Sequence, residues 1–170
     1  AEYPKSTMPH VNILKWKTRN IDKLLNYFPN VTSLDLRYSN IREEGVKSIV
    51  KKLPNTRLTS LNLYWTNIGD EGVKAIIMEL PNTILSSLDL GYCNIGVEGV
   101  KAIARELPNS RLTFLNLCGN YIGDEGVKAI ARKLLNTRLT SLDLSWNYIG
   151  EECAKAIARE LPNTRLTSLN

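Results

Sequence analysis

Apolar residues recur along this chain in one short pattern that returns every 27 residues. The fourth position of the pattern is filled in turn by Leu34, Leu61, Leu88, Leu115, Leu142 and Leu169. Counted from the first leucine of a copy, positions 1, 4, 6 and 11 are apolar, as at Leu58, Leu61, Leu63 and Ile68. Since one copy of this length cannot bury its apolar face alone, the period indicates a stacked array. Such an array presents a long surface, which favours binding over chemistry.

Each copy reads as a short strand followed by a helix. The alternation of Leu61 and Leu63 is typical of a strand with one buried face. Gly69 then allows a sharp turn, and apolar residues from 73 to 80 follow at the i, i+3, i+4, i+7 spacing of a half-buried helix. Pro81 ends that helix. We therefore predict a strand–helix unit that feeds the next parallel strand.

Polar residues at two places in the copy have predicted structural roles. Asp70 stands at the start of its helix, where its oxygens and charge favour the first turn, and Lys74 follows four residues later as its expected ion-pair partner. The small residues of position 9 are expected to hydrogen-bond the buried turn backbone at the strand end. They are Ser39, Thr66, Cys93, Asn120 and Asn147.

The whole motif is visible between Leu112 and Val127, where the LxxLxLxxNxI strand segment is followed by Ile-Gly-Asp-Glu-Gly-Val. These residues resemble the leucine-rich repeat family in its ribonuclease-inhibitor-like subclass, and similar repeats occur in cytosolic NOD-like receptors. The resemblance covers roughly residues 11–170. It implies a curved α/β solenoid with parallel strands on the concave face and helices on the convex face. The strand–helix–strand rule predicts right-handed crossovers.

At 170 residues the chain is expected to form a single domain. We interpret residues 1–30 as an N-terminal cap and shortened repeat, and residues 31–170 as five 27-residue repeats plus the first strand of a sixth. The alternative for the N-terminal segment is an extra contact site with His10, Lys15, Lys17 and Arg19. Because the sequence stops inside a strand at Asn170, we expect a longer parent chain or a missing cap. A monomer is expected, with end-to-end association possible at the uncapped C-terminus.

Variation between copies is concentrated at positions that should line the strand side. Positions 3, 5 and 7 should point out from the concave face, and positions 8 and 10 should lie along its rim. Tyr and Trp are enriched in binding hot spots because they bury much area at low entropic cost. The alternative is that these rings pack on one another and cover the turn backbone, which fits position 8 better than position 7. The predicted protein-binding residues of this kind are Arg37, Tyr38, Tyr64, Trp65, Tyr92, Phe114, Cys118 and Trp146.

Position 5 alternates between aspartate and asparagine, with Asp35, Asp89 and Asp143 in every second copy. Interleaved amides relieve the repulsion that a continuous row of carboxylates would create. The alternation then serves solubility and spacing, or it makes a mildly acidic concave floor that contributes to partner binding. Two strand spacings, about 10 Å, separate successive aspartates, which is too far for an acid–base pair or a metal site.

The net charge of +5 raises nucleic acid as a partner, but the placement of charges argues against it. Basic residues lie on the helix side among glutamates, whereas the aromatic residues lie on the strand side, so the two do not converge. The sequence has no run of 18 or more apolar residues, so no membrane span is expected.

Three cysteines at unrelated positions argue against a disulfide framework and favour a reducing compartment. We predict that Cys93 is buried, that Cys118 is exposed on the concave side, and that Cys153 replaces a helix glycine of the sister repeats. With no zinc-type spacing and His10 as the only histidine, no metal or other cofactor is expected.

The leading hypothesis is a non-enzymatic module that binds a protein through its concave face and aromatic rim. It would act in the cytoplasm, or in a host cytoplasm if the protein is an effector. One alternative is a structural or regulatory repeat segment of a larger receptor or pathogen effector. A second is a regulator of small GTPases, for which Arg37 and Asn40 are the candidate residues.

Overall fold

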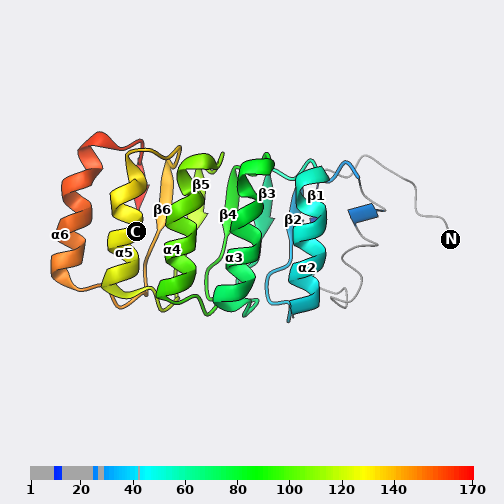
Figure 1. Ribbon diagram of the computed structural model, residues 1–170, viewed down its shortest axis with the longest axis horizontal. Coiled ribbons are helices and arrows are strands. Elements are labelled where there is room, and N and C mark those ends of the chain that lie inside the picture. Colours follow the sequence, from blue (N-terminus) through cyan, green and yellow to red (C-terminus); the bar gives the residue numbers. More distant parts are fainter. Residues whose placement is uncertain (1–9, 13–24, 27–28, 42) are drawn as a thin grey trace.

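The computed structural model describes residues 10–12, 25–26, 29–41 and 43–170. These form one sheet of seven parallel strands in sequence order (Figure 1). Each residue pairs with the residue at the same position of the next copy, as Leu34 does with Leu61. The strands are β1 (His10–Asn12), β2 (Ser33–Asp35), β3 (Ser60–Asn62), β4 (Ser87–Asp89), β5 (Phe114–Asn116), β6 (Ser141–Asp143) and β7 (Ser168–Leu169).

One helix follows each of the strands β2 to β6. They are α2 (Glu43–Lys52), α3 (Gly69–Glu79), α4 (Val97–Glu106), α5 (Gly123–Leu134) and α6 (Glu151–Glu160). Four helices pass into a 3₁₀ turn with the sequence Leu-Pro-Asn, namely η2 (Leu53–Asn55), η3 (Leu80–Asn82), η4 (Leu107–Asn109) and η5 (Leu161–Asn163). In the remaining copy Leu135 replaces the proline, and α5 continues for 12 residues without such a turn.

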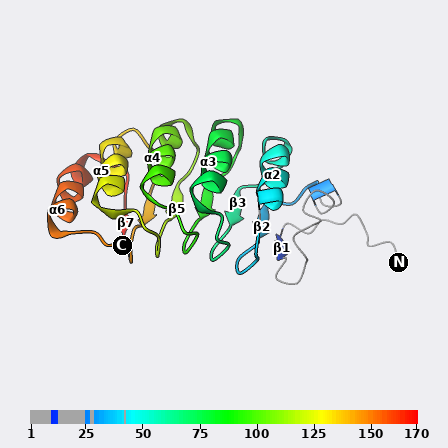
Figure 2. The same cartoon turned by 60° about the horizontal axis from the view of Figure 1, so that its bottom comes forward.

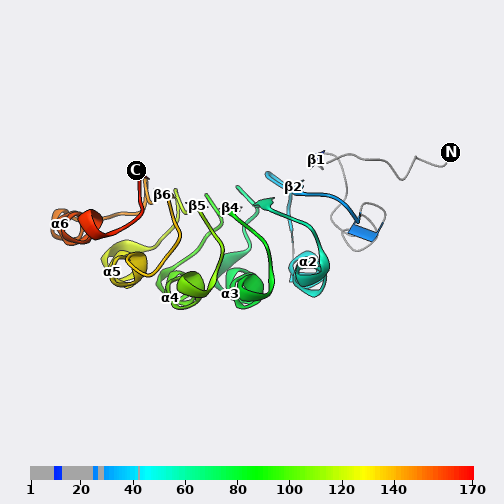
Figure 3. The same ribbon diagram turned by 90° about the horizontal axis from the view of Figure 1, so that it is seen from above.

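The units stack into a curved array, with helices α2 to α6 side by side in one layer and the strands in the other (Figures 1 and 2). Seen from above, the helices follow the outer side of an arc and the strands its inner side (Figure 3). Helices are wider than strands, so stacking them at one side of a sheet curves the array toward the strands. The predicted leucine-rich-repeat solenoid, with concave strands and convex helices, is confirmed.

The apolar positions of every copy meet in one core between the sheet and the helices. Leu61 and Leu63 are 1% and 0% exposed, and Ile76 and Ile77 of α3 are fully buried against them. Because each copy contributes the same residues, the core continues from Leu25 to Ile157 among the described residues. The periodic pattern therefore predicted the buried face correctly.

Neighbouring helices approach closely at position 15, which is usually glycine. A Cβ added to Gly99 would lie 2.8 Å from Ile95 Cγ2 and 3.0 Å from Val73 Cγ1 of the preceding helix. In α6 the same position holds Cys153, which is fully buried. The prediction that this cysteine replaces a helix glycine is confirmed.

Asp70 lies in the first turn of α3, as predicted from its charge, but its predicted hydrogen bond and ion pair within that helix are not found among the described residues. Its side chain makes no cap bond within α3, and its Oδ1 instead accepts the N–H of Gly96 in the next copy at 2.7 Å. Lys74 accordingly pairs with Glu71, at 2.7 Å, and not with Asp70. An aspartate at this place links adjacent copies, which a single copy cannot reveal.

The predicted division into a cap of residues 1–30 and a repeat region stays a prediction. Most of that cap, with Lys15, Lys17 and Arg19 of the alternative contact site, lies outside the described residues.

Candidate functional site

The strand ends on the concave side share one tight turn. In each copy the Asp or Asn of position 5 accepts the backbone N–H of position 7, two residues later, in an Asx turn. The bonds join Arg37 to Asp35 (3.1 Å), Tyr64 to Asn62 (2.9 Å), Gly91 to Asp89 (3.0 Å), Cys118 to Asn116 (2.9 Å) and Ser145 to Asp143 (2.9 Å). The Asp/Asn alternation therefore has a structural role that the sequence did not reveal, and either residue fills it because both carry the accepting Oδ1.

Position 8, which follows this turn, adopts the left-handed conformation in all five copies. Its φ is 58° at Tyr38, Trp65 and Trp146, 53° at Tyr92 and 63° at Gly119. A bulky side chain in this conformation costs about 1–2 kcal/mol, which glycine avoids. Four aromatic residues nevertheless occupy it, so the backbone is strained at each of these four positions.

Four of the rings form a continuous group, here called the aromatic strip: Tyr38, Tyr64, Trp65 and Tyr92. Trp65 stacks on Tyr92 with ring centroids 5.0 Å apart, and Tyr64 meets Tyr38 and Tyr92 edge-on at 5.7 and 5.4 Å. Tyr38 and Trp65 remain 63% and 55% exposed. The strip thus supports itself through ring contacts and still presents open aromatic surface.

The tyrosines of the strip lean over small residues one copy ahead. A Cβ on Gly91 would lie 2.7 Å from Tyr64 Cδ2, and one on Gly119 would lie 2.5 Å from the Tyr92 ring. Glycine at these two places therefore leaves the space that the two tyrosine rings occupy. Cys118 packs close to the same glycine, because its Sγ would lie 3.0 Å from a Cβ added to Gly91.

The prediction that Cys118 is exposed on the concave side is consequently wrong, because only 9% of the residue is exposed. Burial raises the pKa of its thiol. Cys93 is buried as predicted, and burial raises the pKa of its thiol to about 11. All three cysteines are free.

The remaining rings of the strand side stand apart from the strip. Trp146, one of the predicted protein-binding residues, is 79% exposed, and Phe114 on β5 is 36% exposed. No ring contact joins either to the strip among the described residues. Tyr121 and Tyr148 stack at 6.5 Å as a second exposed pair, which the predicted set omitted. The change from Asn to Tyr at position 10 was the available signal for them.

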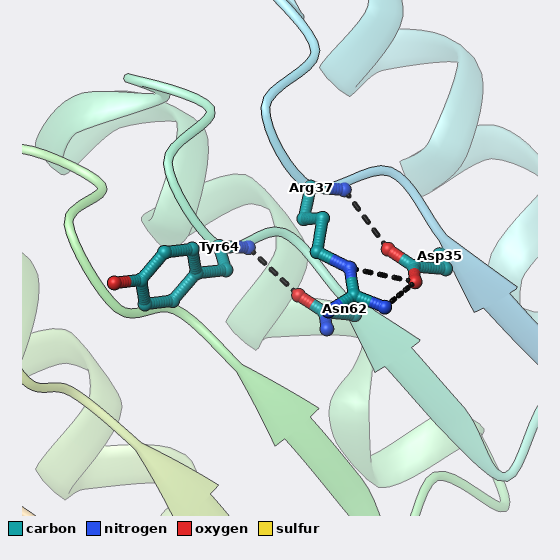
Figure 4. Close-up of polar contacts among 4 residues, drawn as sticks. All are labelled: Asp35, Arg37, Asn62 and Tyr64. Carbon is teal, nitrogen blue, oxygen red and sulfur yellow. Dashed lines mark hydrogen bonds and ion pairs between the residues drawn. The ribbon is translucent and has the colours of Figure 1, made fainter. Parts of the chain in front are cut away.

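Arg37 is folded back onto its own strand (Figure 4). Its Nε and Nη2 donate to Oδ2 of Asp35 at 2.9 and 2.7 Å, and this hydrogen bonding raises the pKa of Arg37. Its side chain is 43% exposed, so it lies at the surface with its charge already paired.

Asp89 and Asp143 make up the rest of the predicted acidic floor. Asp89 is half-buried, and burial raises its pKa. Asp143 Oδ1 accepts the N–H and the Oγ–H of Ser145, the latter at 2.6 Å. Among the described side chains, no Lys or Arg lies within ion-pair distance of either carboxylate. Neither carboxylate therefore has an ion pair in the described part of the chain, although the charge of Arg37, which is bound to Asp35, also acts on Asp89.

On the helix side, the lysine at position 17 of the repeat pairs with a glutamate in each of the helices α3 to α6. The pairs are Lys74–Glu71, Lys101–Glu98, Lys128–Glu125 and Lys155–Glu151, at 2.7 to 3.3 Å. Exposed pairs of this kind contribute little to stability, because water and salt screen them. They leave a surface of mixed sign, as the sequence predicted.

Within the described part of the chain, no group of three His, Cys, Asp or Glu side chains is arranged to hold a metal ion. No helix described there is both long enough and apolar enough to cross a membrane.

Comparison with known proteins agrees with this geometry. The family model described as leucine-rich repeat matches residues 29–50, 55–76, 82–104, 109–131 and 135–158, more than half of the chain. No curated protein matches. A solved structure described as leiomodin-1 actin-binding site 2 is 23% identical, with a TM-score of 0.70 over 91% of this chain and 90% of that chain. That likeness shows a shared fold, and the matched repeats show the family: this chain belongs to the leucine-rich repeat family.

Proposed function

We propose that this chain is a non-enzymatic protein-interaction module that binds a protein partner through its concave face and aromatic strip. The observation that carries the proposal is the strip itself. Four rings are in mutual contact, and three of them, Tyr38, Trp65 and Tyr92, occupy a strained backbone conformation. Pre-positioned Tyr and Trp rings lose little entropy on binding and are frequent hot spots.

Two further points support the proposal. The solved structure of similar fold is described as an actin-binding site of leiomodin-1, so a repeat array of this shape serves protein binding elsewhere. That description belongs to the other protein, and the partner of this chain remains to be identified. The ribonuclease-inhibitor-like subclass and an intracellular setting belong to the same proposal, the latter because three free cysteines suit a reducing compartment.

Regulation of a small GTPase through Arg37 and Asn40 is less well supported. Arg37 is held by Asp35 through two side-chain hydrogen bonds. It would have to break this ion pair before it could reach a partner's nucleotide. An array that serves only as a spacer remains the other alternative, and it predicts no partner on either face.

The test is affinity capture with chemical crosslinking, with wild-type protein compared with Trp65→Ala. Truncation of a buried aromatic anchor should weaken a captured complex by about 2 kcal/mol or more, roughly thirtyfold. Lys101→Ala and Lys128→Ala are the matched controls on the helix side, where an exposed charge should matter little. Trp146→Ala tests whether the contact extends beyond the strip.

A partner lost with Lys101→Ala and Lys128→Ala but kept with both tryptophan variants would place the contact on the helices and refute the proposal. Absence of any specific partner would favour the spacer. Circular dichroism of each variant checks that the fold is retained.

A further inference from the structure

From residue 31 on, the concave face has a charge opposite to that of the chain as a whole. In the five copies from residue 31 on, the outward positions 3, 5 and 7 and the rim positions 8 and 10 carry three acidic groups, Asp35, Asp89 and Asp143, and one basic group, Arg37. Three negative charges and one positive charge leave −2 on this face, whereas the whole chain carries +5. A partner that docks here meets a negative surface on an otherwise positive molecule.

Asp89 and Asp143 form no ion pair with a described residue, because Arg37, the basic group of these positions, pairs with Asp35 at 2.7 Å. Both are half-buried, so each has lost part of its hydration without gaining an ion pair among the described residues. Cations from a partner would satisfy them, and hydrogen bonds to charged groups are the strong ones. The buried Cys118 lies between them as a neutral floor.

The aromatic strip adjoins this floor and suits the same kind of partner. Tyr64 directly follows the turn that Asn62 closes at the end of β3, and its ring meets Tyr38 and Tyr92 edge-on, so the strip begins where the strands of the floor end. Tyr and Trp faces attract ammonium and guanidinium groups, and they also pack well against proline. Basic side chains are therefore compatible with both halves of the surface.

The spacing of the carboxylates selects a backbone conformation. Asp89 and Asp143 lie on β4 and β6, two strand spacings or about 10 Å apart. A β-strand crossing the sheet would place same-side residues at about 7 or 13 Å, which misses this distance. A polyproline II segment returns to the same side every third residue, at about 9 Å. Aromatic-lined surfaces are also the usual docking sites of that conformation.

We propose that the concave face binds an extended basic segment of a partner protein in the polyproline II conformation. Two cationic side chains three residues apart pair with Asp89 and Asp143, and the flanking residues lie along the aromatic strip. This inference rests on the proposed protein-binding function and adds the chemistry of the partner.

The chain supplies its own matched substitutions for a test. Asn62 and Asn116 make the same turn bond, at 2.9 Å, that Asp89 makes at 3.0 Å. Asp89→Asn and Asp143→Asn therefore remove the charge and keep the turn. Asp70→Asn, on the helix side of the molecule, is the control for a lost charge that should not matter.

The assay is fluorescence anisotropy with labelled proline- and alanine-rich peptides of nine residues that carry two arginines. We expect the peptide with arginines three residues apart to bind more tightly than peptides with spacings of two or four. Each aspartate variant should lose up to about fivefold in affinity and the double variant up to about 25-fold. Higher salt should weaken wild-type binding more than that of the double variant. Asp70→Asn should leave it unchanged.

A gain of affinity is also expected. Arg37→Ala removes the ion-pair partner of Asp35. Asp35 lies two strand spacings from Asp89, on the side away from Asp143. A peptide with three arginines, each three residues apart, should therefore bind more tightly to this variant than to wild-type protein.

The inference is overturned if the three-spaced peptide does not bind, if a glutamate-containing peptide binds equally well, or if the double variant retains full affinity. The capture experiment with the natural partner tests the proposed function independently of this peptide assay. A partner that needs Trp65 but not the two aspartates leaves the function standing and removes this inference. A partner that is kept with Trp65→Ala and Trp146→Ala but lost with Lys101→Ala and Lys128→Ala removes the function.

Discussion

Asn120 is the side chain whose removal should disturb the array most for its size. It is 1% exposed, and its Oδ1 accepts the N–H groups of Cys93 and Ile95 in the preceding copy at 3.1 and 2.9 Å. Its Nδ2 donates to the carbonyls of Leu90 and Leu117, each at 2.9 Å, and to that of Cys118 at 3.2 Å. One amide therefore satisfies the strand-end turns of two adjacent copies.

Asn120→Ala would leave two buried N–H groups without their acceptor. Each such group costs about 1–3 kcal/mol, while the carbonyls are less affected because each has a second lone pair. We expect the free energy of unfolding to fall by about 3–5 kcal/mol. At about 2–4 °C per kcal/mol for a chain of this size, the melting temperature should fall by roughly 10 °C.

Thermal and urea unfolding followed by circular dichroism measure this loss. Asn109→Ala is the control, since that exposed amide makes only a 3.5 Å bond to Glu106 and should cost less than about 0.5 kcal/mol. Repeat arrays can unfold in parts, so amide exchange should also be measured at Cys93 and Ile95, where protection should fall first. A loss below about 1 kcal/mol with unchanged exchange at both amides would show that the two donors do not depend on Asn120.

Four further outcomes are expected. Gly119→Ala places a Cβ 2.5 Å from the Tyr92 ring at a positive φ, so the free energy of unfolding in urea should fall by about 1–3 kcal/mol. Near-UV circular dichroism should show that the ring is displaced, and an unchanged spectrum would contradict this. Trp65→Asn relieves the left-handed strain, so its stability should stay within about 1 kcal/mol of wild type while partner binding is lost; retained binding would count against the strip. Because burial raises the pKa of Asp89, the folded state binds the carboxyl proton of Asp89 more tightly than the unfolded chain does. The free energy of unfolding should therefore fall as pH rises from the ordinary pKa of aspartate through the raised one. Urea titrations of Asp89→Asn at several pH values should lack this slope. Cys93, with a thiol pKa of about 11, should stay unreactive toward Ellman's reagent at pH 7.5 until the protein unfolds, and rapid labelling of the folded chain would refute its burial.

The sequence alone determined the architecture. The 27-residue period identified the stacked units, and the apolar positions at Leu61, Leu63, Ile76 and Ile77 predicted which faces are buried. This succeeded because in a parallel stack each residue meets the residue at the same position of the next copy. The pairing of Leu34 with Leu61 is one example, so a local pattern also specifies the tertiary neighbours. The hydrogen-bonding role of position 9 followed from the same logic.

Only the tertiary structure decided where the variable side chains of the concave face lie. Tyr64 leans over Gly91, Arg37 turns back onto Asp35, and Asp70 bonds the next copy instead of its own helix. These directions depend on the left-handed turn at position 8 and on the size of the residue one copy ahead. Neither is visible in a single repeat. The residues that differ between copies also have neighbours that differ between copies. A repeating pattern therefore cannot specify the direction of their side chains.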